Sequence, residues 1–559
     1  MLTVILNWLY MLFAFFCLGY AFSKFSGKML RYSIRRVDGI LMAGLIIAAV
    51  YAQIFSLFYR VGIEANVVLL AVCAAVCIAL GRQMAGFLKK AWKNCPLVNK
   101  MILLLIFLAW AFFTSRGYRV TDMDLYHGQS IRWIEEYGVV KGIGNLHCRF
   151  GYNSSVFAVS ALFSMKFLLG RSLHAVNGLI AFLLSMAALD LGKCFRRKKM
   201  LLSDYARVGA VYYLTTIWDE IIAPSSDYAV MCMIFMIVIK WLTQLESEDS
   251  QERNHIAPYG LLCVACAFTL TLKLSAGLIL LLVLKPAYML LKEKRWKEIS
   301  IYLLLGLLTA VPWMARTVFI TGWLLYPFPE LDLFQVDWKM TDLSVIESDA
   351  ALIKTYARGA REMGVEVGIE EWFPHWFQNE LWSTEKLLIL ADAASCVTVI
   401  VSAAVIVMKK KWQKLDLLLV VGTVGCSYVF WQFSAPMMRY GYAHVLLLAA
   451  LVWGYMIEKI KPAKIVYVFL ILYGGYKLYL GCDYIAGCCL LPNYIWQETY
   501  DSYECDSYEV DGVTIYYSGG LTGYDPFPAI PVPEYGVELR GEGLKDGFRL
   551  KQNAGIKSD

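Results

Sequence analysis

The chain has 559 residues, of which 59% are hydrophobic and 17% are charged, with a formal net charge of +7. Soluble domains usually carry about 25% charged residues. A soluble fold of this length could not bury so much apolar surface, so the composition predicts a membrane protein. The basic residues form short clusters between apolar runs, which indicates membrane topology rather than nucleic-acid binding.

The apolar runs predict the crossings of a polytopic, all-α membrane protein. A spanning helix needs roughly 17–25 apolar residues, and about 14 runs satisfy or approach this criterion. They cover residues 3–22, 39–58, 65–80, 97–114, 173–191, 205–222, 228–242, 259–272, 274–291, 299–320, 387–408, 415–431, 441–456 and 465–480. The first run lacks a basic start and a small-residue cleavage site, so we expect a membrane helix rather than a signal peptide.

Basic clusters orient the predicted helices, because Lys and Arg stay on the cytoplasmic side. The clusters lie at 24–36, 82–93, 193–199, 292–297, 409–414 and 459–464. Placing all six inside gives a multi-pass protein of the cell membrane with both termini outside. The predicted parts are helices in 1–116, a first outer loop at 117–172, a transmembrane core at 173–320, a second outer loop at 321–386, helices in 387–480 and an outer tail at 481–559.

Two segments need separate treatment. The apolar run 153–170 and the run 173–191 must together cross an odd number of times, or the cluster at 193–199 falls outside. We therefore expect 153–170 to lie at the interface or dip into it. In the tail, the alternating run 510–517 is broken by Asp511 and Gly512, which predicts a short β-hairpin.

The first outer loop carries the densest set of reactive side chains. Asp122, Asp124, Tyr126 and His127 stand together there, and Arg149 follows. The apolar spacing after Leu125 suits a helix lying flat on the membrane, with Asp122 at its N-terminal end, where the helix dipole favours an anion. A plain N-cap role for Asp122 is the alternative.

A second group of acids stands at the outer end of the run 205–222 and directly after it, and should reach the same face. It contains Asp219 and Glu220, and then Asp227 after a Pro-Ser-Ser turn. Carboxylates at the edge of a membrane core are costly and are functional candidates for that reason. A simply hydrated turn is the alternative.

Isolated cations on the predicted outer side form the third group. Lys273 and Arg316 stand at ends of apolar runs, and Arg439 and Tyr440 stand in a short outer turn. Outer cations oppose the usual distribution of charge. Binding a phosphate would explain them, and Arg offers a bidentate fork for it. Contact with lipid headgroups is the alternative.

Acids and cations on one face suit glycosyl transfer from a lipid-linked sugar. A departing lipid phosphate needs cations as its charge develops. An acceptor hydroxyl needs a carboxylate base. We therefore expect Asp122, Asp124 and Asp227 to act in catalysis. Residues expected to bind substrate are Tyr126, His127, Arg149, Asp219, Lys273, Arg316, Arg439 and Tyr440.

These motifs resemble the GT-C superfamily of polyprenyl-phosphate-sugar-dependent glycosyltransferases, which includes protein O-mannosyltransferases and aminoarabinose transferases. Asp122 and Tyr126 match the spacing of that family's acidic motif, with Met123 where the family often has Glu. Residues 167–177, Asp227 and the step 273–276 resemble later family features, although four helices instead of one precede the loop. The runs 126–153 and 434–440 also look like an uncharacterised bacterial family of multi-pass membrane proteins.

The resemblance implies a polyprenyl-phosphate sugar donor, a glycan or protein acceptor and an enzyme that works within the lipid bilayer. The sequence leaves open whether a divalent metal ion is held by Asp122, Asp124 and His127. Two other functions remain: a transporter (flippase) of polysaccharide or lipid-linked oligosaccharide, and an O-antigen-type polymerase or ligase. Charges near mid-membrane would favour a transporter, whereas charges at the outer surface favour an enzyme.

Overall fold

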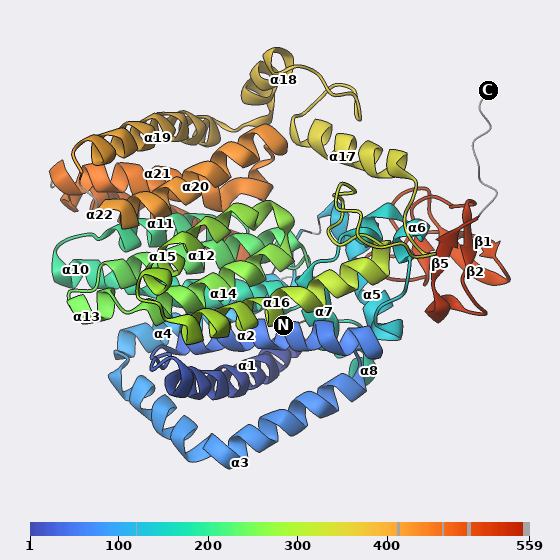
Figure 1. The fold of residues 1–559 in the computed structure, drawn as a ribbon, viewed down its shortest axis with the longest axis horizontal. Coiled ribbons are helices and arrows are strands. Elements are labelled where there is room, and N and C mark those ends of the chain that lie inside the picture. Colours follow the sequence, from blue (N-terminus) through green and yellow to red (C-terminus); the bar gives the residue numbers. More distant parts are fainter. Residues whose placement is uncertain (119, 411–413, 461–462, 489–493, 552–559) are drawn as a thin grey trace.

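A bundle of long helices running side by side, with a small β region at one end, makes up the protein (Figure 1). The computed structural model describes residues 1–559 except 119, 411–413, 461–462, 489–493 and 552–559. The chain is therefore an all-α polytopic membrane protein with a small C-terminal β region, as its composition predicts.

Within the described residues, 12 stretches are long and apolar enough to cross a membrane. They are α1 (Leu2–Met29), α2 (Val37–Phe58), α3 (Ile63–Asn94), α4 (Leu97–Ser115), α9 with α10 (Val176–Ala188 and Lys193–Arg197), α12 (Ser226–Leu245), α14 (Ile256–Leu272, preceded by α13, Ser250–Arg253), the 3-10 stretch Leu274–Val283 with α15 (Leu284–Lys292), α16 (Trp296–Thr321), α19 (Ser383–Met408), α20 (Leu415–Ser434) and α21 (Met438–Ile460).

Two of the predicted crossings differ from these spans. The run 205–222 is not one spanning helix, because α11 (Leu202–Leu214) has only 13 residues and rises about 20 Å. The run 465–480 lies in α22 (Ala463–Cys488), where several side chains are outside the described set. The basic clusters at 409–414 and 459–464 also include residues outside it.

The segment 153–170 does not cross the membrane as a helix. It forms α7 (Ser155–Leu162) and α8 (Lys166–Leu169), which are eight and four residues long. Every residue of α7 is buried, so this part of the segment lies inside the protein, whereas no residue of α8 is buried and its Leu168 is 72% exposed. Ser155 anchors it by donating a hydrogen bond of 2.6 Å to Oγ1 of Thr271 on α14.

The helix after the acidic motif is likewise covered. α5 (Gly128–Tyr137) packs against α7, and its Ile131 and Trp133 are almost fully buried. The expected helix on the membrane surface is therefore wrong, because the polar face of α5 is occupied by the C-terminal tail. There Gln129 donates to the carbonyl of Pro526 and accepts from the amide of Ala529.

Small residues allow α1 and α2 to approach closely. A Cβ atom added at Gly19 would lie 1.9 Å from the carbonyl oxygen of Ile40, and one at Gly44 would lie 1.8 Å from that of Phe15. Close backbone contact through glycine is a common way to pair membrane helices. These two positions therefore fix α1 against α2.

The tail contains the predicted hairpin. β1 (Asp506–Val510) and β2 (Val513–Tyr517) are antiparallel, and Asp511 and Gly512 between them both have positive φ. Such a turn matches the twist of paired strands. The remaining strands are β3 (Ala529–Ile530), parallel to β2, and the pair β4 (Val537–Leu539) and β5 (Phe548–Leu550).

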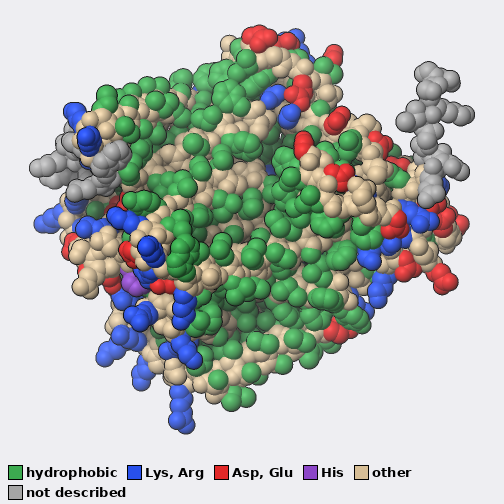
Figure 2. Space-filling model, in the orientation of Figure 1, with side chains coloured by type: hydrophobic (Ala, Val, Ile, Leu, Met, Phe, Trp, Pro, Cys, Tyr) green, Lys and Arg blue, Asp and Glu red, His purple; other side chains and the backbone are tan. Residues whose placement is uncertain are grey.

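The two ends of the bundle differ in charge. Hydrophobic side chains cover the middle of the face in Figure 2, whereas Lys and Arg gather at the end that carries α10 and α13. We call this the basic end, and the opposite end with the β strands the tail end. The amide of Leu2 bonds the carbonyl of Tyr494 at 3.0 Å, so the N-terminus lies beside the start of the tail.

The second outer loop contributes short elements. They are α17 (Leu343–Ala357) and α18 (Ile369–His375), and α6 (Ile143–Leu146) lies in the first loop. Several apolar side chains of α17 are exposed, including Leu343, Val345 and Leu352. An exposed apolar face on an otherwise polar loop suits contact with lipid.

Candidate active site

Asp122 begins the helical segment that carries the acidic motif. One π-helical turn (Met123–His127) continues directly into α5, and such turns often occur at functional sites. The Asp122 side chain caps no backbone amide, so the simple N-cap interpretation does not account for it. The carboxylate is 24% exposed and points to other charged groups instead.

Arg439 is the centre of a cluster of ion pairs. Its Nη2 lies 2.7 Å from Oδ2 of Asp122, and its Nε lies 3.2 Å from Oδ2 of Asp227. The other oxygen of Asp227 pairs with Nζ of Lys273. Four residues from four separate parts of the chain, each predicted as a site residue, thus form one continuous network.

Helix ends explain why these four residues meet. Asp227 is in the first turn of α12, which Ser225 caps, and Arg439 is in the first turn of α21. Lys273 directly follows α14. A carboxylate is favoured at a helix N-terminus, and the helices end at one level, so their terminal charges converge.

Arg149 extends the network to the second outer loop. Its Nη1 lies 3.7 Å from Oδ1 of Asp122, and its Nε lies 3.1 Å from Oδ1 of Asp349 on α17. The hydroxyl of Tyr152 donates to Asp349 at 2.7 Å. Asp349 could not be predicted from the sequence, because no local pattern distinguishes it from other loop acids.

Aromatic and imidazole rings border the charges. The ammonium of Lys273 lies 3.8 Å from the ring centre of Tyr440, and the rings of Tyr126 and His127 lie 4.4 Å apart. Burial raises the pKa of Tyr126, and the nearby carboxylates of Asp122 and Asp227 raise it further.

His127 is buried and neutral at neutral pH. Burial lowers its pKa to about 4, although Asp122 and Asp227 oppose this shift. Its Nδ1 has no hydrogen-bond partner among the described residues. Buried polar atoms are usually paired, so this nitrogen is free to contact a ligand.

Asp124 does not join the cluster. Its side chain is buried against the tail, where it accepts from the amide of Asp501 at 3.4 Å and from the hydroxyl of Tyr503 at 3.3 Å. Its carbonyl accepts from the amides of Thr522 and Gly523. Asp124 therefore holds the tail rather than supporting Asp122.

Two other predicted site residues also lie elsewhere. Arg316 is buried, and it donates to Oδ1 of Asn153 at 3.0 Å and to Oγ of Ser56. It joins α16 to α2 and to the first outer loop, which is a structural role. Asp219 contributes its carbonyl to the amide of Tyr118 at 2.6 Å and makes no contact with the cluster among the described contacts.

A bound metal has no set of ligands in the described part of the chain. No group of three His, Cys, Asp or Glu residues is close enough there to hold an ion. Asp122 pairs with Arg439, whereas Asp124 faces the tail, so the two acids do not converge as chelating ligands must.

Comparison with known proteins places the chain in a family. The family model described as "Domain of unknown function (DUF8201)" matches residues 1–472. The chain belongs to this family. The match covers α1 to α21 and the whole charged cluster, and it ends within α22, before the tail. No curated protein and no solved structure matches the chain.

Proposed function

We propose that this DUF8201 protein is a membrane glycosyltransferase that moves a sugar from a polyprenyl-phosphate donor to an acceptor on the extracytoplasmic face. The supporting observation is the network in which Arg439 contacts both Asp122 and Asp227, and Lys273 contacts Asp227. It offers cations for a phosphate and a partly exposed carboxylate for a hydroxyl at one place.

The reaction assigns one role to each group. Asp122 accepts the proton of the acceptor hydroxyl, whose oxygen forms the new bond to the anomeric carbon. The bond from that carbon to the phosphate oxygen breaks, and the polyprenyl phosphate leaves with the electron pair. Arg439 and Lys273 stabilise the negative charge on the leaving phosphate, and Arg149 holds Asp122 in place.

The proposed orientation of the protein in the membrane follows from the positions of its Lys and Arg residues. The cluster lies at the tail end of the bundle, because the carbonyl of Asp124, two residues after Asp122, accepts hydrogen bonds from the amides of Thr522 and Gly523 in the tail. Because Lys and Arg remain in the cytoplasm, the site and both termini are outside. This places the site where lipid-linked sugars meet acceptors destined for the cell envelope.

Cysteine labelling tests this orientation. A membrane-impermeant maleimide should label cysteines introduced at Glu370 and Gly520, but not at Lys90 or Lys198, in a background in which the exposed Cys426 and Cys482 are serine. Lysed cells should label all four positions and serve as the control. Labelling of the Lys198 position in intact cells would show that this position lies outside and would contradict the proposed topology.

The transfer assay tests the activity. Purified protein in liposomes receives polyprenyl-phosphate sugars with candidate acceptors, and free polyprenyl phosphate is measured. Asp122→Asn should lower turnover by about 10²–10⁴-fold, the usual contribution of a general base. Glu370→Gln, a change of an exposed acid on the second outer loop, should match the wild type. Equal turnover in Asp122→Asn contradicts the assignment.

A transporter is the second candidate, and one residue favours it. Asp392 lies within α19, is fully buried, and neither carboxylate oxygen has a hydrogen-bond partner among the described residues. Ionisable groups inside a membrane helix often mark a transport or proton pathway. If Asp392→Asn abolishes lipid-linked sugar movement across liposomes while Asp122→Asn does not, the transporter is the better description.

A further inference from the structure

A large cavity lies far from the charged cluster. Its volume is about 890 Å³, and α2, α12, α14 and α16 form its walls. None of Asp122, Asp227, Lys273 or Arg439 lines it. The cavity therefore belongs to neither the donor nor the acceptor side of the proposed reaction.

The lining changes from charged to apolar along α2. At the basic end the wall includes Arg36 and Asp38, and farther along the helix it includes Ile46, Val50 and Ile54. From residue 38 to residue 54 the helix rises about 24 Å, close to the hydrocarbon thickness of a bilayer, about 30 Å. A polar mouth and a long apolar interior match an amphipathic ligand.

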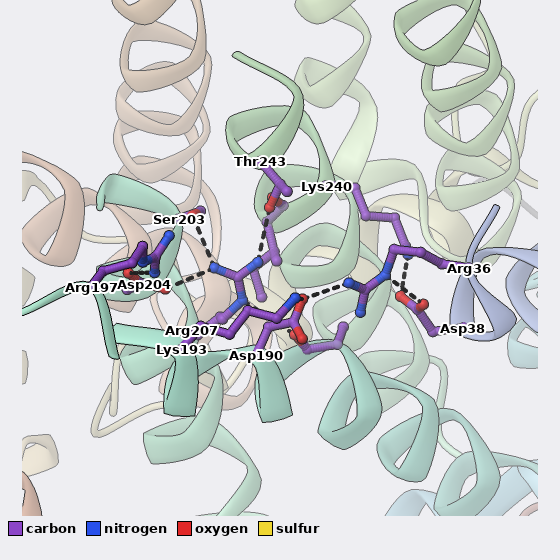
Figure 3. A network of polar contacts seen from close by, with 12 residues as sticks. Arg36, Asp38, Asp190, Lys193, Arg197, Ser203, Asp204, Arg207, Lys240 and Thr243 are labelled. Carbon is purple, nitrogen blue, oxygen red and sulfur yellow. Dashed lines mark hydrogen bonds and ion pairs between the residues drawn. The ribbon is translucent and has the colours of Figure 1, made fainter. Parts of the chain in front are cut away.

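The far end of the cavity is closed by packing. Arg316 of α16 donates to Ser56 near the end of α2, which brings these two helices together at the tail end. At the basic end α2 is instead linked to α12 through the ion pair of Asp38 with Lys240. The charged residues Arg36, Asp38 and Lys240 (Figure 3) thus line the basic end of the cavity.

Charged side chains of both signs meet at the basic end of the cavity, where Arg36 also pairs with Asp190. Asp38 is shared between two cations: Nε of Arg36 lies 2.9 Å from Oδ1, and Lys240 pairs with Oδ2 (Figure 3). The charged side chains that line the cavity are four cations and three acids. The members are Arg35, Arg36, Arg207, Lys240, Asp38, Asp249 and Glu252.

We propose that this cavity binds a membrane lipid with an anionic phosphate headgroup, with the phosphate beside Arg36 and Lys240 and the chain along α2. Arg and Lys together are the usual phosphate partners. The apolar interior selects a lipid over a free phosphate, because burying the methylene groups of the lipid chain is favourable. The site is independent of the proposed glycosyl transfer and stands at the opposite end of the bundle.

A blocking variant and a matched control test the proposal. Ala43 lines the cavity, so Ala43→Trp fills the space for the chain. Ala75 is exposed on α3, so Ala75→Trp adds the same side chain where lipid already surrounds the helix. After exhaustive washing in alkyl maltoside, wild type and Ala75→Trp should retain stoichiometric, solvent-extractable lipid phosphorus, and Ala43→Trp should lose it.

A binding titration follows the headgroup separately. Short-chain phosphatidylglycerol added to delipidated wild type should raise its melting temperature, because a ligand that binds only the folded state stabilises it. Lys240→Gln, which leaves Asp38 paired with Arg36, should need about tenfold more lipid, as expected for one lost charge-assisted contact. Size-exclusion chromatography checks that each variant is folded.

Three results would overturn the proposal. The first is equal lipid retention in Ala43→Trp and wild type, which would indicate lipid bound elsewhere. The second is an equal response to diacylglycerol of the same chain length, which would remove the role of the phosphate. The third is an equal response to inorganic phosphate, which would make the site a plain anion site.

Discussion

Two ion pairs at opposite ends of this bundle, Asp122–Arg439 and Asp204–Arg207, differ in access to solvent. At the tail end, Asp122 is 24% exposed and Arg439 is 16% exposed. At the basic end, Asp204 is fully buried and Arg207 is 5% exposed, and both are surrounded by other polar groups (Figure 3). Exposure therefore separates charges that can exchange partners from charges that are fixed.

The fixed network joins helices. Arg207 donates to Ser203 and Asp204 on its own helix, to the carbonyl of Ala187 on α9 and to Thr243 on α12. Each of these hydrogen bonds therefore pairs a buried polar group, and burial of that group without a partner would cost free energy. Arg439 instead contacts two carboxylates, those of Asp122 and Asp227, and its partly exposed charge is available for a ligand.

Replacing one aspartate by asparagine in each network should give the largest difference in the free energy of unfolding. Asp204→Asn keeps the shape but leaves the buried charge of Arg207 without its carboxylate, which should lower the free energy of unfolding by about 3–5 kcal/mol. Asp122→Asn should lower it by less than about 1 kcal/mol, because Asp122 is partly exposed and Arg439 keeps Asp227. Melting temperatures in detergent measure both, and equal losses would show that the tail-end network is structural too.

The members of the tail-end network could be predicted from the sequence because Asp227, Lys273 and Arg439 stand at the ends of apolar runs. Asp122 begins the acidic motif of the loop on the same side. Helix ends on one side of a membrane share one level, so Asp122, Asp227, Lys273 and Arg439 could be grouped before their contacts were known. The direction of a side chain within its turn could not be predicted. Asp124, two residues from Asp122, faces the tail for this reason.

Contacts between residues of distant loops also could not be predicted from the sequence. Asp349 meets Arg149 across 200 residues, and nothing in the pattern around either residue indicates the pair. Arg316 was predicted to bind substrate because outer cations are unusual, but its partners Ser56 and Asn153 are uncharged groups in other segments. The number of predicted membrane spans is larger than the number observed partly because the run 205–222 forms only the short helix α11, which irregular chain follows.

Replacing Arg439 by lysine should weaken binding of the donor at the tail-end network. The guanidinium reaches Asp122 and Asp227 at the same time, whereas an ammonium acts as a single point charge. We expect Arg439→Lys to raise the donor KM by about tenfold or more, the loss of one charge-assisted hydrogen bond, while the acceptor KM changes little. Steady-state kinetics with each substrate varied in turn measure the two values. An equal rise in both would place Arg439 in general packing.

The smallest expected effect is a pH dependence of stability at the tail end. The pKa of His127 is about 4 in the folded protein, below the usual value of 6.5, because burial disfavours the charged ring. The unfolded chain therefore binds more protons between these values, and stability is lost as the pH falls. From pH 7.5 to pH 5.5 the loss is about 1.4 kcal/mol for this histidine. Melting temperatures across this range should fall less steeply in His127→Gln than in wild type. Asp204→Asn should keep the wild-type slope, because the basic-end network lies far from His127. An unchanged slope in His127→Gln would mean that His127 has the same pKa in the folded and the unfolded chain, so that burial does not shift it.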